Sequence, residues 1–466
     1  MTIYITKVKA IGVHNQFDFD EDLHEGMNIF YGLNGTGKTT FLQIIANILN
    51  SDFERFKHII FKYIEVTYSN GDVLKLDYHT QKNIFRISKN SLRAIHEIDK
   101  DFSNRVFGNP QIDYIDGLEP LVKSLYIPAF RLIVDAWFYS SQNNLRNDDE
   151  RINEKTLYAR QVFGEFVPVI DYPSVTEVLD KLTEDLKQAR LKLANSERDL
   201  FLRYLSSFYI PSLNQSNKNI VADQSVELRY EDIKKIVSEL QSNQFQNETE
   251  SLNQFVTQID SLFLQDNNST EQNHENRNVI LDTYHKFFSD LLKIQKEYYK
   301  NLDSYLNAVN NFLINKKLVF EKENDDSIEP TFCFKYINDS YNSDHNRLLL
   351  DGVQSLSSGE RQIVSFIYAC YFTKNKVVLI DEPETSLHID WQRELLDSIS
   401  QYSHQFIICT HSPSVPADYS DYLKKLNVRQ TDKSVWDDNY IDTNKNDENL
   451  NHNNESEDME DIEVAI

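Results

Sequence analysis

Residues 27–40 have the sequence MNIFYGLNGTGKTT. Met27 to Tyr31 form an apolar segment typical of a buried strand, and apolar residues from Phe41 to Ile48 recur at helical spacing. Between them lies the pattern G-x-x-x-x-G-K-[ST], which in this strand–turn–helix context indicates a P-loop that cradles phosphate groups. The sequence therefore predicts a nucleotide site built around this turn.

Each residue type in the turn suits phosphate binding. Gly32, Gly35 and Gly37 carry no Cβ, so backbone N–H groups can point at phosphate oxygens. The helix that begins near Lys38 directs its positive N-terminus at the same group. We expect Lys38 to reach the β- and γ-phosphates and the Thr39 hydroxyl to bind Mg²⁺. The expected ATP contacts are Gly32, Asn34, Gly35, Gly37, Lys38, Thr39 and Thr40.

Three further segments place polar residues at the ends of predicted elements. Residues 355–362, SLSSGERQ, precede a predicted helix. Residues 377–380 form a continuous apolar run, as expected for a strand buried on both faces. Asp381 and Glu382 follow at its carboxyl end, where open α/β sheets bind ligands. Residues 405–413, QFIICTHSP, form another such strand, which ends near His411.

Together these segments resemble the motifs of ABC-type ATPases: Walker A, the signature L-S-[GS]-G-[EQ], Walker B with its adjacent glutamate, and the switch histidine. His388 stands where the transporter pattern has aspartate, and Asn34 lies in a Gly-x-Asn-Gly-x-Gly-Lys segment. In both features the sequence resembles OLD and RecF-like ATPases more than transporter ATPases. The resemblance implies an α/β head of the OLD, RecF and SMC type, with a mostly parallel sheet and an antiparallel meander split by an α-helical insert. Residues 412–466 are too few for the TOPRIM nuclease domain of OLD proteins, which we expect to be absent.

The resemblance also implies how the motifs cooperate. Two heads pack head to tail, so that ATP lies between Walker A of one chain and the signature of the other. Thr39 and Asp381 would hold Mg²⁺, Glu382 would polarise the attacking water, and His411 would contact the γ-phosphate. Glu384 is an alternative base, because the E-P-E segment places two carboxylates close together. The signature residues expected to act in trans are Ser357, Gly359 and Glu360.

Composition excludes several protein classes. The chain has 466 residues, 40% of them hydrophobic, without an apolar run that could span a membrane or a secretory signal pattern, so we expect a cytoplasmic protein. Cys333, Cys370 and Cys409 are expected to be reduced core residues. A net charge of −25 opposes general electrostatic binding of DNA, although a local basic groove would be compatible with it.

The motifs divide the chain into four regions. Residues 1–171 form an ATPase lobe with Walker A, and 172–318 form a helical insert. Residues 319–430 form a lobe with the signature, Walker B and the switch histidine, and 431–466 form an acidic tail that we expect to be disordered. In the first lobe, alternating apolar residues predict strands at 3–5, 17–20, 61–68, 73–78 and 83–87, with a hairpin turn at Asn70-Gly71.

Apolar residues at helical spacing predict three helices in the insert, over 174–209, 230–264 and 279–313. A polar linker is expected at 267–278. Because no heptad repeat is sustained, we expect a compact insert and not the extended arm of an SMC protein.

Arg131 follows a short strand in the segment Pro128-Ala129-Phe130-Arg131. Family relatives carry a similar stretch close to the nucleotide, so Arg131 is a candidate for contacting phosphate or a neighbouring subunit. The alternative is a surface arginine paired with a carboxylate.

The ATPase portion is similar to stand-alone ATPases of bacterial anti-phage defence systems, the class that includes PARIS. This resemblance implies a slow ATPase that forms homo-oligomers, senses infection and controls a separately encoded effector such as a nuclease. One alternative is a RecF-like or SMC-like repair ATPase that clamps DNA. A transporter ATPase subunit is the other alternative, which the helical insert and His388 disfavour.

Overall fold

A computed structural model of the chain describes residues 2–79, 82–90, 95–99, 118–141, 148–209, 225–245, 257, 271–321, 330–337, 352–372, 376–400, 402–426 and 429–430. The predicted acidic tail and residues 246–270, apart from 257, lie outside this part. No helix in the described part is both long and apolar enough to cross a membrane. Cys333, Cys370 and Cys409 are buried free thiols, as predicted for core cysteines.

A parallel sheet holds the motif-bearing strands. In the described residues its order is β13-β3-β12-β11-β8, and every neighbouring pair is parallel. The apolar runs of β3, β11 and β12 are almost completely buried, because other elements cover both faces. The carboxyl ends of these three strands therefore meet at one edge. The bounds are β3 Gly26–Tyr31, β8 Lys123–Ile127, β11 Lys376–Asp381, β12 Gln405–Thr410 and β13 Leu423–Lys425.

An antiparallel sheet lies beside it, as the sequence predicts, with the order β14-β2-β1-β4-β5-β6-β7 among the described strands. Buried and more exposed residues alternate along β4, β5 and β6, and Gly71, at φ 86°, turns β4 into β5. Strand β7 was not predicted. The bounds are β1 Ile5–Val13, β2 Phe17–Asp22, β4 Tyr63–Tyr68, β5 Val73–His79, β6 Ile84–Lys89, β7 Ile95–Asp99 and β14 Arg429–Gln430.

Side chains tie the two sheets together around helix α1, Lys38–Leu49. The buried Gln405 amide at the start of β12 accepts a hydrogen bond from Ile5 N and donates to Ile5 O at 2.7 Å. Phe41 of α1 packs against Phe19 of the antiparallel sheet and Phe30 of the parallel sheet, with ring centroids 5.4 Å apart in both cases. The P-loop helix thus lies in a core to which both sheets contribute, and the predicted α/β head with two kinds of sheet is confirmed.

The head contains further described elements besides these two sheets. They are the 3₁₀ helices η1 Phe53–His58, η3 Gly352–Ser355 and η4 Ala417–Tyr422, the helices α2 Arg131–Ser141, α3 Asp148–Phe163, α8 Ser358–Phe372 and α9 Ile389–Ile399, and the hairpin of β9 Lys316–Glu321 with β10 Thr331–Tyr336.

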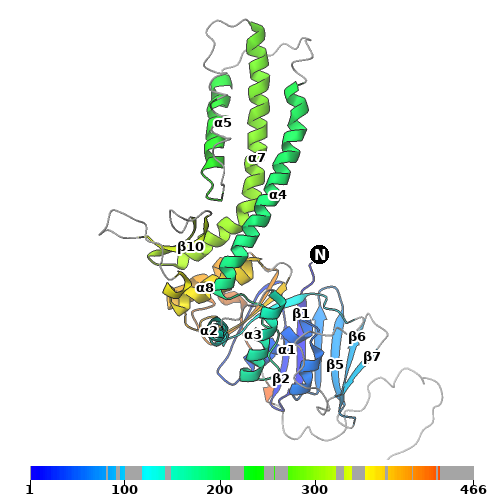
Figure 1. The fold of residues 1–466 in the computed structure, drawn as a ribbon. Coiled ribbons are helices and arrows are strands. Elements are labelled where there is room, and N and C mark those ends of the chain that lie inside the picture. Colours follow the sequence, from blue (N-terminus) through cyan, green and yellow to red (C-terminus); the bar gives the residue numbers. More distant parts are fainter. Residues whose placement is uncertain are drawn as a thin grey trace, which may run out of the picture.

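The helical insert forms an arm, made of α4 Val175–Tyr209, α5 Ser225–Gln241 and α7 Glu271–Phe312, that rises away from the head (Figure 1). At 1.5 Å per residue, the 42 residues of α7 span about 63 Å. The expectation of a compact insert is therefore wrong. The arm needs no long heptad repeat, because α5 packs on α7 as a third helix and shares its apolar contacts.

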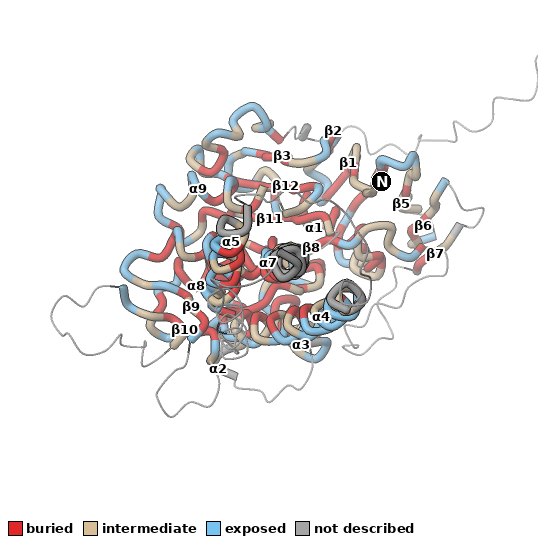
Figure 2. Tube along the Cα trace, turned by 90° about the horizontal axis from the view of Figure 1, so that it is seen from above, coloured by how far each residue is buried: buried red, intermediate tan, exposed pale blue. Residues whose placement is uncertain are grey.

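Two cores support the arm. Near the head, residues of α4 and α7 join the main core. Figure 2, in which the arm points toward the viewer, shows buried segments of the head around these helices. Farther out lies a separate cluster of Leu200, Tyr230, Ile233, Val237, Leu240, Leu281, Phe288 and Leu291. The predicted polar linker is wrong from Glu271 onward, because α7 already begins there. Glu, Gln and Arg residues favour a helix even where it carries no apolar face.

Candidate ATP-binding and hydrolysis site

The P-loop connects β3 to α1 in the conformation that its glycines allow. Gly35 and Gly37 have φ of 81° and 83°, which residues with a Cβ rarely adopt. A Cβ on Gly37 would also lie 3.0 Å from Phe19 Cζ. The Lys38 ammonium lies inside the loop, where it donates to Gly32 O at 2.8 Å and Leu33 O at 3.1 Å. Lys38 is only 5% exposed, so its charge is directed into the turn and not toward solvent.

Thr39 and Asp381 bring Walker A and Walker B together. The Thr39 hydroxyl donates a 2.8 Å hydrogen bond to Asp381 Oδ2. Asp381 Oδ1 is buried and accepts no hydrogen bond from the described residues. Burial raises the pKa of Asp381 to about 6, with the Thr39 hydroxyl acting in the opposite direction. A buried carboxylate oxygen without a donor beside a hydroxyl fits a Mg²⁺ ion, which needs few protein ligands when phosphates and water supply the rest.

Glu382 and Glu384, two positions apart in the E-P-E segment, have different surroundings in the structure. Glu384 is buried, and its Oε1 accepts from Thr410 Oγ1 at 2.7 Å and from the N–H groups of His411 and Ser412. Glu384 therefore fixes the turn that follows β12. The Glu382 side chain is 28% exposed and has its Oε1 3.4 Å from His411 Nδ1. Between the two carboxylates, Glu382 is the one that can meet a water molecule.

The His411 ring lies between these carboxylates, with Nδ1 3.1 Å from Glu384 Oε1. Its side chain remains 47% exposed, so the ring can also contact a ligand. Glu382, Glu384 and His411 thus come together at the adjacent ends of β11 and β12.

Arg131 lies directly behind this group, at the start of α2. The residue is 2% exposed, and its guanidinium donates to the carbonyl oxygens of Pro128, Asp381, Glu382 and Pro383. Two roles are predicted for Arg131 from the sequence: contact with a phosphate or a neighbouring subunit, or a surface ion pair with a carboxylate. Neither matches the observed role, in which the buried side chain binds backbone carbonyls. The side chain turns inward because β8 lies next to β11.

The signature begins helix α8 with a capping box. The Ser357 hydroxyl accepts from Glu360 N at 3.2 Å, and Glu360 Oε2 accepts from Ser357 N at 2.7 Å. Glu360 also pairs with Lys316 at 2.9 Å, and these hydrogen bonds lower its pKa although burial acts against them. Ser357 is exposed, whereas Glu360 is buried. In the described residues neither side chain hydrogen-bonds to the P-loop. Of the two, only Ser357 is exposed and could contact another chain.

Two residues near the signature have structural roles that sequence reasoning missed. A Cβ on Gly359 would lie 2.9 Å from Ser386 O, so glycine allows α8 to approach the loop after Walker B. His388 caps α9, because its Nδ1 accepts from Asp390 N at 3.4 Å. The S-x-x-E pattern of Ser357 and Glu360 could have revealed their capping box from the sequence. The contact at Gly359 has no such signal, because it depends on tertiary packing.

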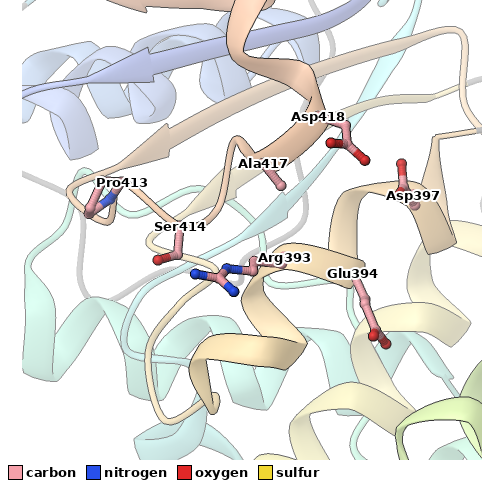
Figure 3. A pocket seen from close by; sticks show the side chains of 7 residues that line it. All are labelled: Arg393, Glu394, Asp397, Pro413, Ser414, Ala417 and Asp418. Carbon is pink, nitrogen blue, oxygen red and sulfur yellow. The ribbon is translucent and has the colours of Figure 1, made fainter.

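A cavity of about 420 Å³ lies between α9 and the segment after His411 (Figure 3). Its lining contains none of the expected ATP contacts, so this cavity is distinct from the nucleotide site. The lining residues are Arg393, Glu394, Asp397, Pro413, Ser414, Ala417 and Asp418.

The model of the AAA ATPase domain family matches residues 13–415, from β1 to just beyond His411. The chain belongs to this family. This ATPase matches no curated protein. Its fold is similar to that of the recombination mediator protein RecF with ATP, in the RecFOR pathway, at 12% identity and a TM-score of 0.33, covering 92% of this chain and 98% of RecF. It is also similar to the SMC head bound to the C-winged helix domain of ScpA, at 12% identity and a TM-score of 0.39, covering 92% of this chain and 99% of the SMC head chain.

Proposed function

We propose that this ATPase is an ATP-dependent switch whose arm communicates the nucleotide state to a partner protein. Lys38 and the P-loop N–H groups hold the β- and γ-phosphates, and Thr39 with Asp381 holds Mg²⁺. Glu382 orients the attacking water, and His411 contacts the γ-phosphate. Phosphoryl transfer needs this charge neutralisation and in-line placement more than covalent chemistry by the protein.

In this proposal ATP closes a homo-oligomer. The Ser357 hydroxyl and the N-terminus of α8 in one chain meet the γ-phosphate held by the P-loop of another chain. Because ATP then binds the closed state better than the open one, ATP binding shifts the population toward closure and hydrolysis reverses the shift.

The observation that carries the proposal is the attachment of the arm to the signature helix. The Tyr368 hydroxyl of α8 donates to Asp185 of α4 at 2.8 Å. In addition, Tyr305 of α7 donates to Val364 O of α8 at 3.0 Å, and Tyr371 of α8 donates to Ser304 O of α7. A displacement of α8 during closure would therefore act on both long helices of the arm.

The charge of the arm favours a protein partner over DNA. In α4 the acidic and basic residues are equal in number, and in α5 and α7 the acidic residues are in excess. Binding to DNA phosphates needs Lys and Arg gathered against the backbone, and none of the three helices has a basic excess. We therefore propose that the ATPase is a sensor and scaffold in bacterial anti-phage defence, with a separately encoded effector, for instance a nuclease, docked on the arm. The defence role itself rests on the motif resemblance.

Co-purification tests this function. Wild-type and Glu382→Gln proteins would be expressed with the products of the adjacent genes and purified with ATP or with ADP. We expect one such product to be retained in one nucleotide state and released in the other, and we expect the ATPase alone to leave DNA and RNA intact with Mg²⁺ or Mn²⁺. Equal retention of every product in both states, or metal-dependent cleavage by the ATPase alone, would contradict the proposal.

The alternative, a RecF-like or SMC-like repair ATPase that clamps DNA, gives a different result. DNA would then stimulate ATP hydrolysis severalfold, and raising the salt concentration would steeply weaken this stimulation. The same preparations can be assayed with and without duplex DNA, so one experiment separates the two functions.

A further inference from the structure

The guanidinium of Arg131 holds together the backbone at the ends of two neighbouring parallel strands. Nη1 donates to Pro128 O, just after β8, at 3.0 Å, and to Asp381 O, the last residue of β11, at 3.3 Å. Both Nη atoms donate to Glu382 O at 3.3 Å, and Nη2 donates to Pro383 O at 3.1 Å. A lysine could not make this set of contacts, because its ammonium lacks the planar fork of donors.

The turn that Arg131 binds has an unusual backbone. Glu382 has φ of 46°, in the left-handed region that residues with a Cβ rarely adopt. Its N–H donates to Cys409 O at 2.8 Å, so β12 holds the turn from the opposite side. Such a conformation persists only where neighbouring groups determine it, and here the guanidinium and β12 are those neighbours. The direction of the Glu382 side chain depends on this turn.

Arg131 is itself fixed from behind. Burial lowers its pKa to about 10, which still leaves the guanidinium charged at neutral pH. The Tyr172 hydroxyl donates to Arg131 O at 3.1 Å. Buried Lys155 bonds to Tyr172 O and to Glu177, which in turn accepts from Ser174 N at the start of α4. A continuous set of polar contacts thus runs from the turn at Glu382 to the root of the arm.

We propose that Arg131 is the positioning residue of the ATPase site, because its guanidinium fixes the Asp381–Pro383 backbone so that Glu382 faces the attacking water. This role rests on the proposed function of Glu382. Because Arg131 is buried and its guanidinium is bonded to backbone carbonyls, we expect its loss to change the rate of hydrolysis and not the affinity for ATP.

The test measures ATP affinity and single-turnover hydrolysis of pre-bound ATP in Arg131→Lys, normalised to the number of nucleotide sites. We expect unchanged affinity and a rate about 10²-fold lower, since a misplacement of about 1 Å typically has an effect of this size. Arg160→Lys is the matched control. Arg160 is also buried in the head, and it bonds to Val167 O and Asp52 away from the site. We expect it to keep the wild-type rate.

A double-mutant cycle separates positioning from general stabilisation. If Arg131 acts through Glu382, Arg131→Lys should lower the rate little further in a Glu382→Gln background. Tyr172→Phe, which removes only one hydroxyl, is the milder variant if Arg131→Lys does not fold, and it should show the same non-additivity.

The outcomes are distinct. A wild-type rate of hydrolysis for Arg131→Lys overturns the positioning role. So does an equal fold-loss of rate when Arg131→Lys is made in the wild-type and in the Glu382→Gln background. A wild-type rate for Glu382→Gln instead contradicts the proposed function of Glu382.

Discussion

The Thr39 hydroxyl donates a 2.8 Å hydrogen bond to Asp381 Oδ2, although the two residues are 342 positions apart in the chain. The bond joins the P-loop helix to the end of β11, and the whole arm lies between them in sequence. The candidate ATP site therefore forms only when both halves of the head fold together. Closing such a long loop costs conformational entropy, which the shared core of α1, β11 and β12 offsets.

Replacing each glutamate of the E-P-E segment distinguishes their roles. Glu382→Gln should lower hydrolysis about 10²-fold or more with little change in melting temperature, because glutamine cannot act as a base. Glu384→Gln should lower the melting temperature, because Glu384 holds the turn at Thr410–Ser412. Single-turnover assays and thermal melts measure both effects. The reverse assignment of the two phenotypes would make Glu384 the base.

Lys38→Ala should weaken ATP binding by about 10- to 100-fold, the size expected for one charge-assisted hydrogen bond to phosphate. Calorimetric titration measures this loss, and circular dichroism should show an intact fold. Thr36→Ala is the matched control, because Thr36 also donates to Leu33 O but brings no charge to the loop. Equal affinities for the Lys38→Ala and wild-type proteins would rule out the P-loop assignment.

Gly359→Ala should destabilise the contact between α8 and the loop at Ser386. The added Cβ would lie 2.9 Å from Ser386 O, and overpacking of this kind typically costs about 1 to 3 kcal/mol. Ser358→Ala, at an exposed neighbouring position, should be close to wild type. Denaturant unfolding of both variants tests the packing, and equal stabilities would show that α8 moves aside without cost.

Asp135 should make stability depend on pH. Burial raises its pKa from an ordinary value of about 3.8 to about 7, while Lys155 and Arg131 act to lower it and Glu177 to raise it. Between these two values the folded state holds one more proton than the unfolded state, so Asp135 lowers the stability as pH rises toward 7. The difference in stability between Asp135→Asn and wild type should therefore be more favourable to the variant at pH 8.5 than at pH 5.5. Denaturant midpoints at the two pH values measure this, and an equal difference at both would contradict it.

The sequence was sufficient for much of the fold because several signals are local. The strand before Gly32, the helix after Lys38 and the apolar run before Asp381 each identify their own element. Parallel strands then bring the polar residues at their ends to one edge, which is why Thr39, Asp381, Glu382 and His411 could be predicted to lie together.

Other features depend on contacts that a sequence does not display. The inward direction of Arg131 follows from the pairing of β8 with β11, and the difference between Glu382 and Glu384 follows from one left-handed backbone angle. The insert was expected to be compact because no heptad repeat is sustained, yet α4, α5 and α7 share one apolar cluster that supports an arm without such a repeat. The domain boundaries, and the contribution of Ser357 to a site in another chain, stay predictions.

The most direct test of the account is complementation between two inactive variants. Lys38→Ala lacks phosphate binding, and Ser357→Arg places a bulky charge where the other head should close. Ser357→Ala controls for the lost helix cap, which should cost only about 1 kcal/mol. Each mixed pair keeps one intact site, so random mixing in pairs should restore about one quarter of wild-type hydrolysis. No recovery, in a sample where mixed assemblies are shown to form, would contradict a site shared between two chains.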